Sequence, residues 1–294
     1  MIYCGCWNKQ IYSAAIDPAL PLKNTPQLTN GHTDFVKCVL TISLSGIRYL
    51  LSGGADSTII VWDLDSGRPL HKLTGHTKAI QDLAQDSEDE LEGSSCVIFS
   101  ASSDREIRRW HISKESAYEL PESLEKPILA HDTSVYKLRF DRDGDLWTAS
   151  ADKTAKHLVR DREWEADTAL QHPDFVRDIV LAERAGLVVT ACRDEELRVW
   201  DISSGDLLCT YSGHFEEVTG LALVYDEATV VSVSIDGTVR SWGLGEGDMK
   251  KYLEETKKAR DGESEPLGGE EKKDEGLLTA EEEAELAELM DEDN

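Results

Sequence analysis

Residues 31–63 read GHTDFVKCVLTISLSGIRYLLSGGADSTIIVWD, and this stretch decides the fold. It contains two short runs rich in β-branched and apolar residues, Phe35–Leu44 and Tyr49–Ser52, with Ser-Gly between them. Short runs that are bounded by Gly, Asp and Ser predict antiparallel strands joined by tight turns. Helical periodicity is nearly absent before residue 246, so the sequence predicts an all-β protein.

The same pattern recurs along the chain at intervals of 41–55 residues. In five units a His precedes two strand-like runs, and an Asp follows them in a turn, with a hydroxyl residue four positions before the Asp. A Trp stands six positions after the Asp in four units, and Leu158 takes this place in the third. Each set is called here by its histidine, as in "the His32 unit". The sets are His32, Ser52, Asp56 and Trp62; His76, Ser100, Asp104 and Trp110; His131, Thr148 and Asp152; His172, Thr190, Asp194 and Trp200; and His214, Ser232, Asp236 and Trp242.

With Gly31-His32 near the start of a unit and Trp62-Asp63 near its end, the chain resembles the WD-repeat β-propeller family. The resemblance covers residues 1 to about 245. It implies four-stranded antiparallel blades that stack around an axis, each burying its faces against its neighbours. We expect a β-propeller of about six blades, with incomplete first and last blades.

The predicted boundaries place a partial first blade at residues 1–29, in which Asn8 takes the Asp position. Full units start near residues 31, 75, 130, 171 and 213. The chain is thus expected to open inside a blade, and no outer strand is evident after Trp242. Two explanations stay open: a truncated or internally started reading frame, such as an N-terminally truncated seven-blade propeller, or a six-blade ring with irregular closure.

Two segments interrupt the repeats. Residues Gln85 to Ser95 read QDSEDELEGSS, a composition that predicts a solvated loop. Residues 246–294 form a tail with 19 acidic and 7 basic residues, which we expect to be largely disordered. Thr279 and Glu282 have the spacing of a capping box, so a short helix over 280–290 is expected within this tail.

The charge balance restricts the class of partner. The chain has 31 Lys and Arg against 58 Asp and Glu, a formal net charge of −27. Nucleic acid as the main ligand is disfavoured, because binding to a phosphate backbone depends on cations that displace its counterions. An anionic membrane surface is disfavoured for the same electrostatic reason, whereas a basic protein or peptide fits the field.

The cysteines and the apolar runs indicate the compartment. Six cysteines stand at positions 4, 6, 38, 96, 192 and 209, and none of the spacings matches a CxxC zinc motif. They are typical of small apolar residues in a reducing compartment. No run approaches the roughly 18 apolar residues of a membrane span, and the first residues lack a signal-peptide pattern. We therefore expect a cytoplasmic or nuclear protein with no cofactor and no metal.

Every unit contains the residue types of a nucleophilic triad, but five copies in register argue against catalysis. An active site needs one nucleophile beside an oxyanion hole and a pocket. We interpret each set instead as a buried network in which the Asp accepts from the imidazole, the imidazole bonds the hydroxyl, and the hydroxyl reaches the indole N–H. This matches the structural tetrad that the family resemblance implies. His157 is interpreted as an ordinary strand residue, and no catalytic residue is predicted.

The resemblance also implies a recognition face, where the loops that enter the innermost strands meet the turns that carry the Asp. The third and fifth residues after each His, and the residue before each Asp, are expected there. Aromatic and Arg side chains are the types that most often anchor interfaces. Packing of Phe35 and Phe175 at a loop base stays open as an alternative. The predicted partner-binding residues are Trp7, Phe35, Lys37, Tyr136, Phe175, Arg177 and Arg193.

The predicted function is therefore a non-enzymatic scaffold, a member of a multiprotein complex, that binds a protein or peptide on this loop face. The alternative is the substrate-receptor subunit of a ubiquitin ligase. Receptors of the cullin-linked kind often carry Trp-Asp-x-Arg at the end of a unit. Here residues 62–65 read WDLD and residues 200–203 read WDIS, without the Arg.

Overall fold

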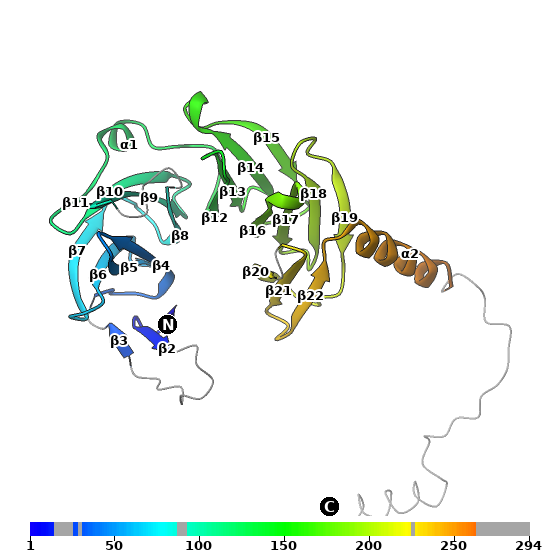
Figure 1. Cartoon of the computed structure of the whole chain (residues 1–294), viewed down its shortest axis with the longest axis horizontal. Helices are drawn as coiled ribbons and strands as arrows, with labels where there is room; N and C mark the ends of the chain where they lie inside the picture. Colours follow the sequence, from blue (N-terminus) through cyan, green and yellow to red (C-terminus); the bar gives the residue numbers. More distant parts are fainter. Residues whose placement is uncertain (15–25, 29–30, 87–92, 225–226, 263–294) are drawn as a thin grey trace, which may run out of the picture. The chain divides into compact units, whose positions relative to one another are not determined.

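The computed structural model describes residues 1–14, 26–28, 31–86, 93–224 and 227–262 (Figure 1). The chain divides into two compact units, Met1–Met249 and a second unit from Lys250 onward. The first unit is built almost wholly from antiparallel strands, so the predicted all-β class is confirmed.

The described residues form six sheets, numbered here in chain order. The first has three strands, β1 (Ile2–Gly5), β2 (Ile11–Ala14) and β3 (Pro26–Leu28). The second has β4 (Val36–Leu44), β5 (Ile47–Gly54), β6 (Thr58–Asp63) and β7 (Arg68–Thr74). The third has β8 (Ile80–Gln85), β9 (Ser95–Ser102), β10 (Ile107–Ser113) and β11 (Ala117–Glu119). The fourth has β12 (Val135–Phe140), β13 (Leu146–Ser150), β14 (Thr154–Val159) and β15 (Glu165–Gln171). The fifth has β16 (Val176–Ala182), β17 (Leu187–Cys192), β18 (Leu197–Asp201) and β19 (Leu207–Tyr211). The sixth has β20 (Val218–Val224), β21 (Thr229–Ser234) and β22 (Val239–Gly243).

The sheets follow one another as the blades of a propeller. The first strands β4, β8, β12, β16 and β20 contact one another in series, and β1 contacts β4. Figure 1 shows these first strands on the inner side of an arc, with the later strands of each sheet farther out. Among the described residues, the first sheet and the last sheet each have three strands, which confirms the prediction of about six blades with incomplete ends.

The core lies between neighbouring sheets, and β5 shows how one strand serves two cores. Successive side chains of a strand point to opposite faces. Leu50 packs with Ile11 of the first sheet, whereas Leu51 packs with Ile80 and Ile98 of the third. Middle strands are thus buried on both faces, while the outer strand β7 is mostly exposed.

The helices lie outside this pattern. They are α1 (Pro121–Glu125), the 3₁₀ turns Arg160–Arg162 and Glu183–Ala185, and α2 (Glu246–Gly262). Helix α2 corrects the prediction for the tail, because its first 17 residues are helical. Glu246 and Asp248 lie in the first turn, where negative charge is favoured by the helix dipole. The predicted helix over 280–290 lies outside the described residues. No helix in the described part of the chain has the length and apolar character to cross a membrane.

The predicted loop from Gln85 to Ser95 is shorter than expected. Gln85 ends β8 and Ser95 begins β9, and residues 87–92 lie outside the described residues. Asp86 is buried, and its carboxylate accepts two hydrogen bonds from Arg160 of the next sheet, at 3.1 and 2.5 Å. The prediction of a solvated segment is wrong for Asp86, because a distant Arg compensates its charge.

Candidate functional site on the loop face

The His32 unit contains a continuous chain of hydrogen bonds. His32 Nδ1 lies 3.0 Å from Asp56 Oδ1, and its Nε2 lies 2.7 Å from Ser52 Oγ. Trp62 donates from Nε1 to the same Ser52 Oγ at 2.8 Å. One tautomer satisfies every group: Nδ1–H donates to the carboxylate, Nε2 accepts from the hydroxyl, and the hydroxyl oxygen accepts from the indole. All of these buried polar atoms therefore have hydrogen-bond partners, as buried polar groups in folded proteins almost always do.

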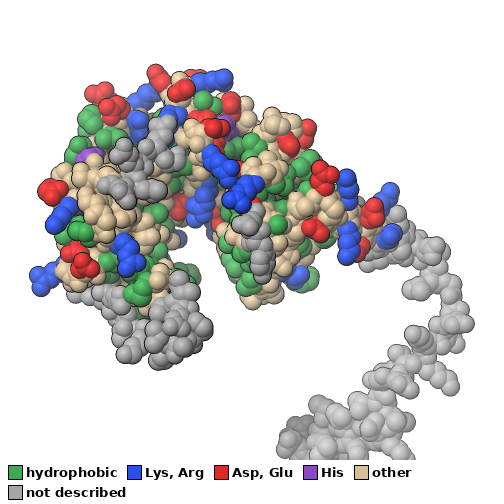
Figure 2. Space-filling model, in the orientation of Figure 1, with side chains coloured by type: hydrophobic (Ala, Val, Ile, Leu, Met, Phe, Trp, Pro, Cys, Tyr) green, Lys and Arg blue, Asp and Glu red, His purple; other side chains and the backbone are tan. Residues whose placement is uncertain are grey.

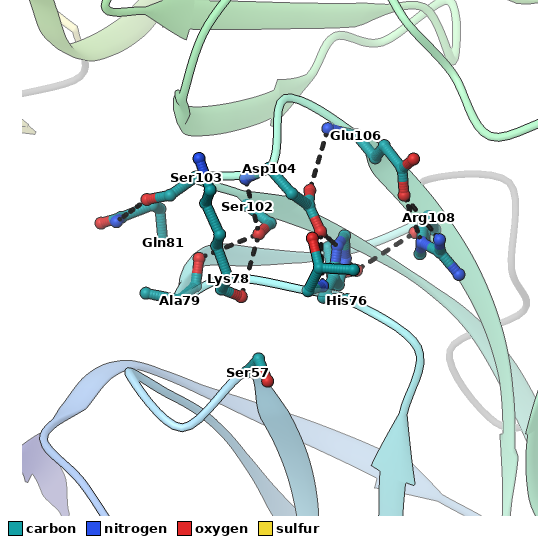
Figure 3. A network of polar contacts seen from close by, with 12 residues as sticks. Ser57, His76, Lys78, Ala79, Gln81, Ser102, Ser103, Asp104, Glu106 and Arg108 are labelled. Atoms are coloured by element: carbon teal, nitrogen blue, oxygen red, sulfur yellow. Dashed lines mark hydrogen bonds and ion pairs between the residues drawn. The ribbon is translucent and has the colours of Figure 1, made fainter.

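The His76, His131 and His214 units repeat this arrangement. In all three the imidazole lies 2.8–2.9 Å from the Asp carboxylate and 2.7 Å from the hydroxyl oxygen. Trp110 and Trp242 donate to their hydroxyl oxygens at 2.7 and 2.8 Å. Figure 3 shows His76 beside Asp104 in one of these networks.

The aspartates of these units are ionised hydrogen-bond acceptors. Burial alone would raise the pKa of Asp56, but bonds from the Thr33 N–H, the Thr58 hydroxyl and His32 lower it to about 2. Hydrogen bonds of the same kind outweigh burial and lower the pKa values of Asp104, Asp152 and Asp236. A backbone N–H directly after the His contributes in each case, as Thr33 does for Asp56.

The His172 unit departs from the prediction. His172 Nε2 lies 2.8 Å from Thr190 Oγ1, but its Nδ1 lies 3.1 Å from the Leu170 carbonyl oxygen and not against Asp194. The Asp194 carboxylate instead accepts two hydrogen bonds from Arg198, at 3.1 and 2.7 Å. The residue after this His is Pro173, which has no N–H to hold the carboxylate beside the imidazole. Burial and then Arg198 lower the pKa of His172 to about 4.

Leu158 occupies the Trp position of the third unit, as the spacing predicts. It pairs with Leu146 across the ladder, just as Trp62 pairs with Leu50. Leu158 is fully buried and packs in one cluster with Phe99. Thr148 Oγ1 also lies 3.2 Å from the Lys156 carbonyl oxygen, and the same contact occurs in the His76 and His172 units, which have the indole.

One main-chain hydrogen bond ties together the two loops that form the predicted recognition face. In each full unit, the N–H of the residue before the Asp donates to the carbonyl of the third residue after the His. These bonds are Ala55 to Phe35 at 2.7 Å, Ser103 to Ala79 at 2.9 Å, Ala151 to Ser134 at 3.0 Å, Arg193 to Phe175 at 2.9 Å and Ile235 to Glu217 at 3.1 Å. The face is therefore held by the backbone and is not built from independent loops.

Three pairs of predicted partner-binding residues contact one another on this face. Trp7 stacks on Phe35 with ring centroids 5.6 Å apart, and the two side chains are 81% and 40% exposed. The Arg193 guanidinium lies 5.1 Å from the Phe175 ring centre. The Arg177 guanidinium lies 4.5 Å from the Tyr136 ring centre and forms an ion pair with Glu217. The Trp7–Phe35 and Arg177–Tyr136 pairs each join two sheets, so the face extends across sheet boundaries.

The fifth residue after each His lies toward the centre of the arc. All five of these residues line one pocket, together with Lys137 and Asp178. They are Lys37, Gln81, Tyr136, Arg177 and Thr219. Figure 2 shows Lys and Arg side chains in blue along the inner side of the arc. The pocket collects one side chain from each of the five full units.

Phe215 and Ile235 are not among the predicted partner-binding residues. Phe215 is 74% exposed and Ile235 is 62% exposed, and both belong to the His214 unit. Ile235 stands before its Asp, as Trp7 stands before Asn8, but the prediction at that position includes only aromatic and Arg residues. Phe215 follows its His directly, and Arg240 lies 5.8 Å from its ring centre. An apolar residue of any type at these offsets is the signal that would have found both.

Two groups of described residues have the composition of a metal site. His76, Asp104 and Glu106 form one, and its His and Asp already bond each other in the network above. Asp141, Asp145 and His157 form the other. There His157 Nε2 lies 3.1 Å from Asp141 and its Nδ1 lies 2.8 Å from Asp167, so both ring nitrogens have carboxylate partners. His157 is therefore part of a polar cluster, which the sequence analysis did not predict.

Comparison with known proteins relates this geometry to a family. The family model "WD domain, G-beta repeat" matches residues 24–63, 67–111, 123–157 and 205–243. The matched ranges do not include the His172 unit. An uncharacterized WD repeat-containing protein of Schizosaccharomyces pombe is 37% identical over 293 residues, which cover 98% of this chain and 71% of that protein.

More distant relatives have varied names. Pre-mRNA-processing factor 19 of Bos taurus is 26% identical over 65% of this chain and 36% of that protein. Nuclear distribution protein nudF of Aspergillus niger is 27% identical over 74% of this chain and 61% of its own length. Among solved structures, the computationally designed protein Ika8 superposes with a TM-score of 0.61 and 25% identity, covering 84% of this chain and 69% of that one.

Proposed function

The chain belongs to the WD-repeat family, and from this premise we propose that it is a non-enzymatic scaffold that binds a protein or peptide on its loop face. The observation that carries the proposal is the set of aromatic and Arg pairs on that face. Trp7 on Phe35, Arg193 on Phe175 and Arg177 on Tyr136 combine residue types that anchor interfaces.

Preorganisation of the face supports the same function. The main-chain bond between the two loops of each unit fixes the backbone under Phe35, Phe175 and Arg193. A binding surface that is already ordered loses less conformational entropy when a partner binds. The large exposed fraction of Trp7 favours a role in recognition over packing alone.

The charge of the chain favours a partner that is mainly basic. The net charge of −27 creates a field that attracts cationic surfaces and repels anionic ones. This attraction is screened over about 8–10 Å at physiological ionic strength, so we expect the affinity to fall as salt is raised.

We further propose that the scaffold works in a multiprotein complex in the cytoplasm or the nucleus. All six cysteines are free thiols, which fits a reducing compartment. This chain spans 36% and 61% of the relatives named for pre-mRNA processing and nuclear distribution, respectively.

The test is affinity purification of the full chain from cells, with mass spectrometry of the captured proteins. The variant Phe35→Ala with Arg177→Glu and Arg193→Glu is compared with the control Tyr118→Ala with Lys72→Glu and Arg162→Glu. The control alters an aromatic residue that is 49% exposed on β11 and makes the same change in net charge. We expect the partners to be lost only from the loop-face variant. Equal recovery with both variants, at unchanged far-ultraviolet circular dichroism, would contradict the proposal.

A further inference from the structure

The pocket at the centre of the loop face is lined mainly by polar groups that can donate hydrogen bonds. Its cationic members are Lys37, Lys137 and Arg177. Lys37 is exposed, and no hydrogen bond or ion pair of its Nζ occurs among the described residues. The hydroxyl of Tyr136 likewise has no hydrogen-bond partner in the described part of the chain. Two free donors, one of them a full positive charge, therefore border the same pocket.

The acidic groups near this pocket are already used inside the protein. Asp178 is buried and accepts hydrogen bonds from the Ile179 N–H at 2.8 Å and from the Leu221 N–H of the next sheet at 2.9 Å. The carboxylate of Glu217 is compensated by its ion pair with Arg177.

Asp82 is buried in the same way. It accepts from the Leu138 N–H of the next sheet at 3.0 Å and lies 3.3 Å from Lys137 Nζ. Asp82 and Asp178 thus tie neighbouring sheets together and are not free acceptors. Lys137 is only partly neutralised, because Asp82 shares its negative charge with that backbone donor and with Arg139, 3.6 Å away.

We infer that this pocket binds one anionic side chain, a carboxylate or a phosphate, presented by a partner segment that is otherwise neutral or basic. The inference rests on the proposed function and names the chemistry of its centre. Lys37 Nζ and the Tyr136 hydroxyl line the pocket as donors for the anion, and the partly neutralised Lys137 adds positive charge, whereas Arg177 is compensated by Glu217. The flanking residues of the partner cannot be strongly acidic, because the net charge of −27 repels them. The negative net charge of the chain thus favours neutral or basic flanking residues in the ligand, whereas the cationic pocket favours the single acidic side chain.

The experiment selects binders from random dodecapeptides displayed on phage, using the full chain as bait. We expect the selected peptides to share one Asp or Glu at a fixed position. Replacing that acid by Asn or Gln should raise the dissociation constant about tenfold or more, since hydrogen bonds to charged groups contribute about 1.5–3 kcal/mol. A synthetic peptide with phosphoserine at the same position identifies whether carboxylate or phosphate binds more tightly.

Matched variants of the bait complete the test. Lys37→Gln, alone or combined with Lys137→Gln, should lower the affinity for the acid-containing peptide to that for the same peptide with Asn or Gln in place of the acid. The control Lys72→Gln with Lys114→Gln makes the same charge change at exposed positions, on β7 and between β10 and β11, and should leave binding unchanged. Selected peptides without a shared acid, but sensitive to Phe35→Ala, would overturn this inference and leave the proposed function standing. Selection of no peptide at all would contradict both.

Discussion

From the hydroxyl residue to the Trp, the His76 and His172 units contain equivalent residue types at the same spacing, yet they make different hydrogen bonds. In both, a Glu stands two positions after the Asp and an Arg stands four positions after it. In the His76 unit, Arg108 pairs with Glu106 at 2.6 Å, and Asp104 stays hydrogen-bonded to His76 (Figure 3). Arg108 also pairs with Glu119 at 3.0 Å.

In the His172 unit the Arg forms an ion pair with the Asp. Arg198 lies 2.7 Å from Asp194 and 2.6 Å from Glu196. The cross-strand neighbour of Trp200 is Leu207, where the His76 unit has Glu119 opposite Trp110. Apart from the Asp of its own unit, Arg198 therefore has one acidic partner, Glu196, whereas Arg108 has two. In addition, Pro173 lacks the backbone donor that would hold Asp194 beside the imidazole. A repeated motif thus depends on neighbours that the motif itself does not include.

The largest expected effect separates the two aspartates. Asp104→Ala leaves the His76 ring and the Thr77 and Glu106 N–H groups without their acceptor, so we expect a loss of about 2–4 kcal/mol in the free energy of unfolding. Asp194→Ala leaves Arg198 paired with Glu196 and should cost about 1 kcal/mol or less. Urea unfolding of both variants measures the difference. Equal losses would show that Asp194 belongs to the His172 network after all.

As the pH is lowered from 7, the His172 unit should be the first of the units to reduce the stability of the fold. The unfolded His takes up a proton below its ordinary pKa of about 6.5, whereas in the folded protein the pKa of His172 is about 4. Between these values the unfolded state binds more protons, so stability falls as the pH falls, by up to about 3 kcal/mol. His172→Gln should remove most of this slope in thermal unfolding from pH 7 to 4.5.

The aspartates respond at lower pH, which separates their contribution from that of His172. The pKa of Asp56 is about 2 in the folded protein, below its ordinary value, so its contribution is complete above about pH 4 and is lost toward pH 2. A slope between pH 7 and 4.5 that survives in His172→Gln would contradict this division.

Leu158→Trp tests a third kind of unit. The space for an indole is already filled by the cluster around Leu158 and Phe99, so overpacking should cost about 1–3 kcal/mol. Thermal unfolding of Leu158→Trp against Leu158→Met, which conserves volume, measures it. A gain in stability would show that the site still accepts the Trp of the other units.

The smallest effect is expected when the His172 unit is given the missing donor. Pro173→Thr with Arg198→Met restores an N–H after the His and frees Asp194, so the pKa of His172 should rise by about one unit or more toward that of a paired imidazole. Nuclear magnetic resonance titration of the His172 ring reads this directly. An unchanged pKa would mean that Pro173 and Arg198 are not the cause of the difference.

The hairpin ladders explain why so much of the fold could be predicted from spacing. Ser52 and Trp62 lie on paired strands, so a fixed offset along the chain gives a fixed contact, and Leu158 follows the same offset. The Asp194 arrangement was missed because the motif ignores the residue after the His, although Pro173 is visible in the sequence.

Contacts between sheets carry no such signal. The Trp7–Phe35 stack and the Asp86–Arg160 pair join segments whose separation in sequence varies from one sheet to the next. Helix α2 was missed because its charged composition outweighed its helix-forming Lys, Glu and Leu residues in the interpretation.

The most direct test of loop-face recognition is hydroxyl-radical footprinting of the full chain, alone and with a captured partner. We expect protection at Trp7, Phe35, Tyr136 and Phe175, with no change at Tyr118 on its outer strand. Protection of Tyr118 and of Leu207 and Leu208 on β19, with Trp7 and Phe35 still reactive, would place the partner on the outer strands and contradict the account.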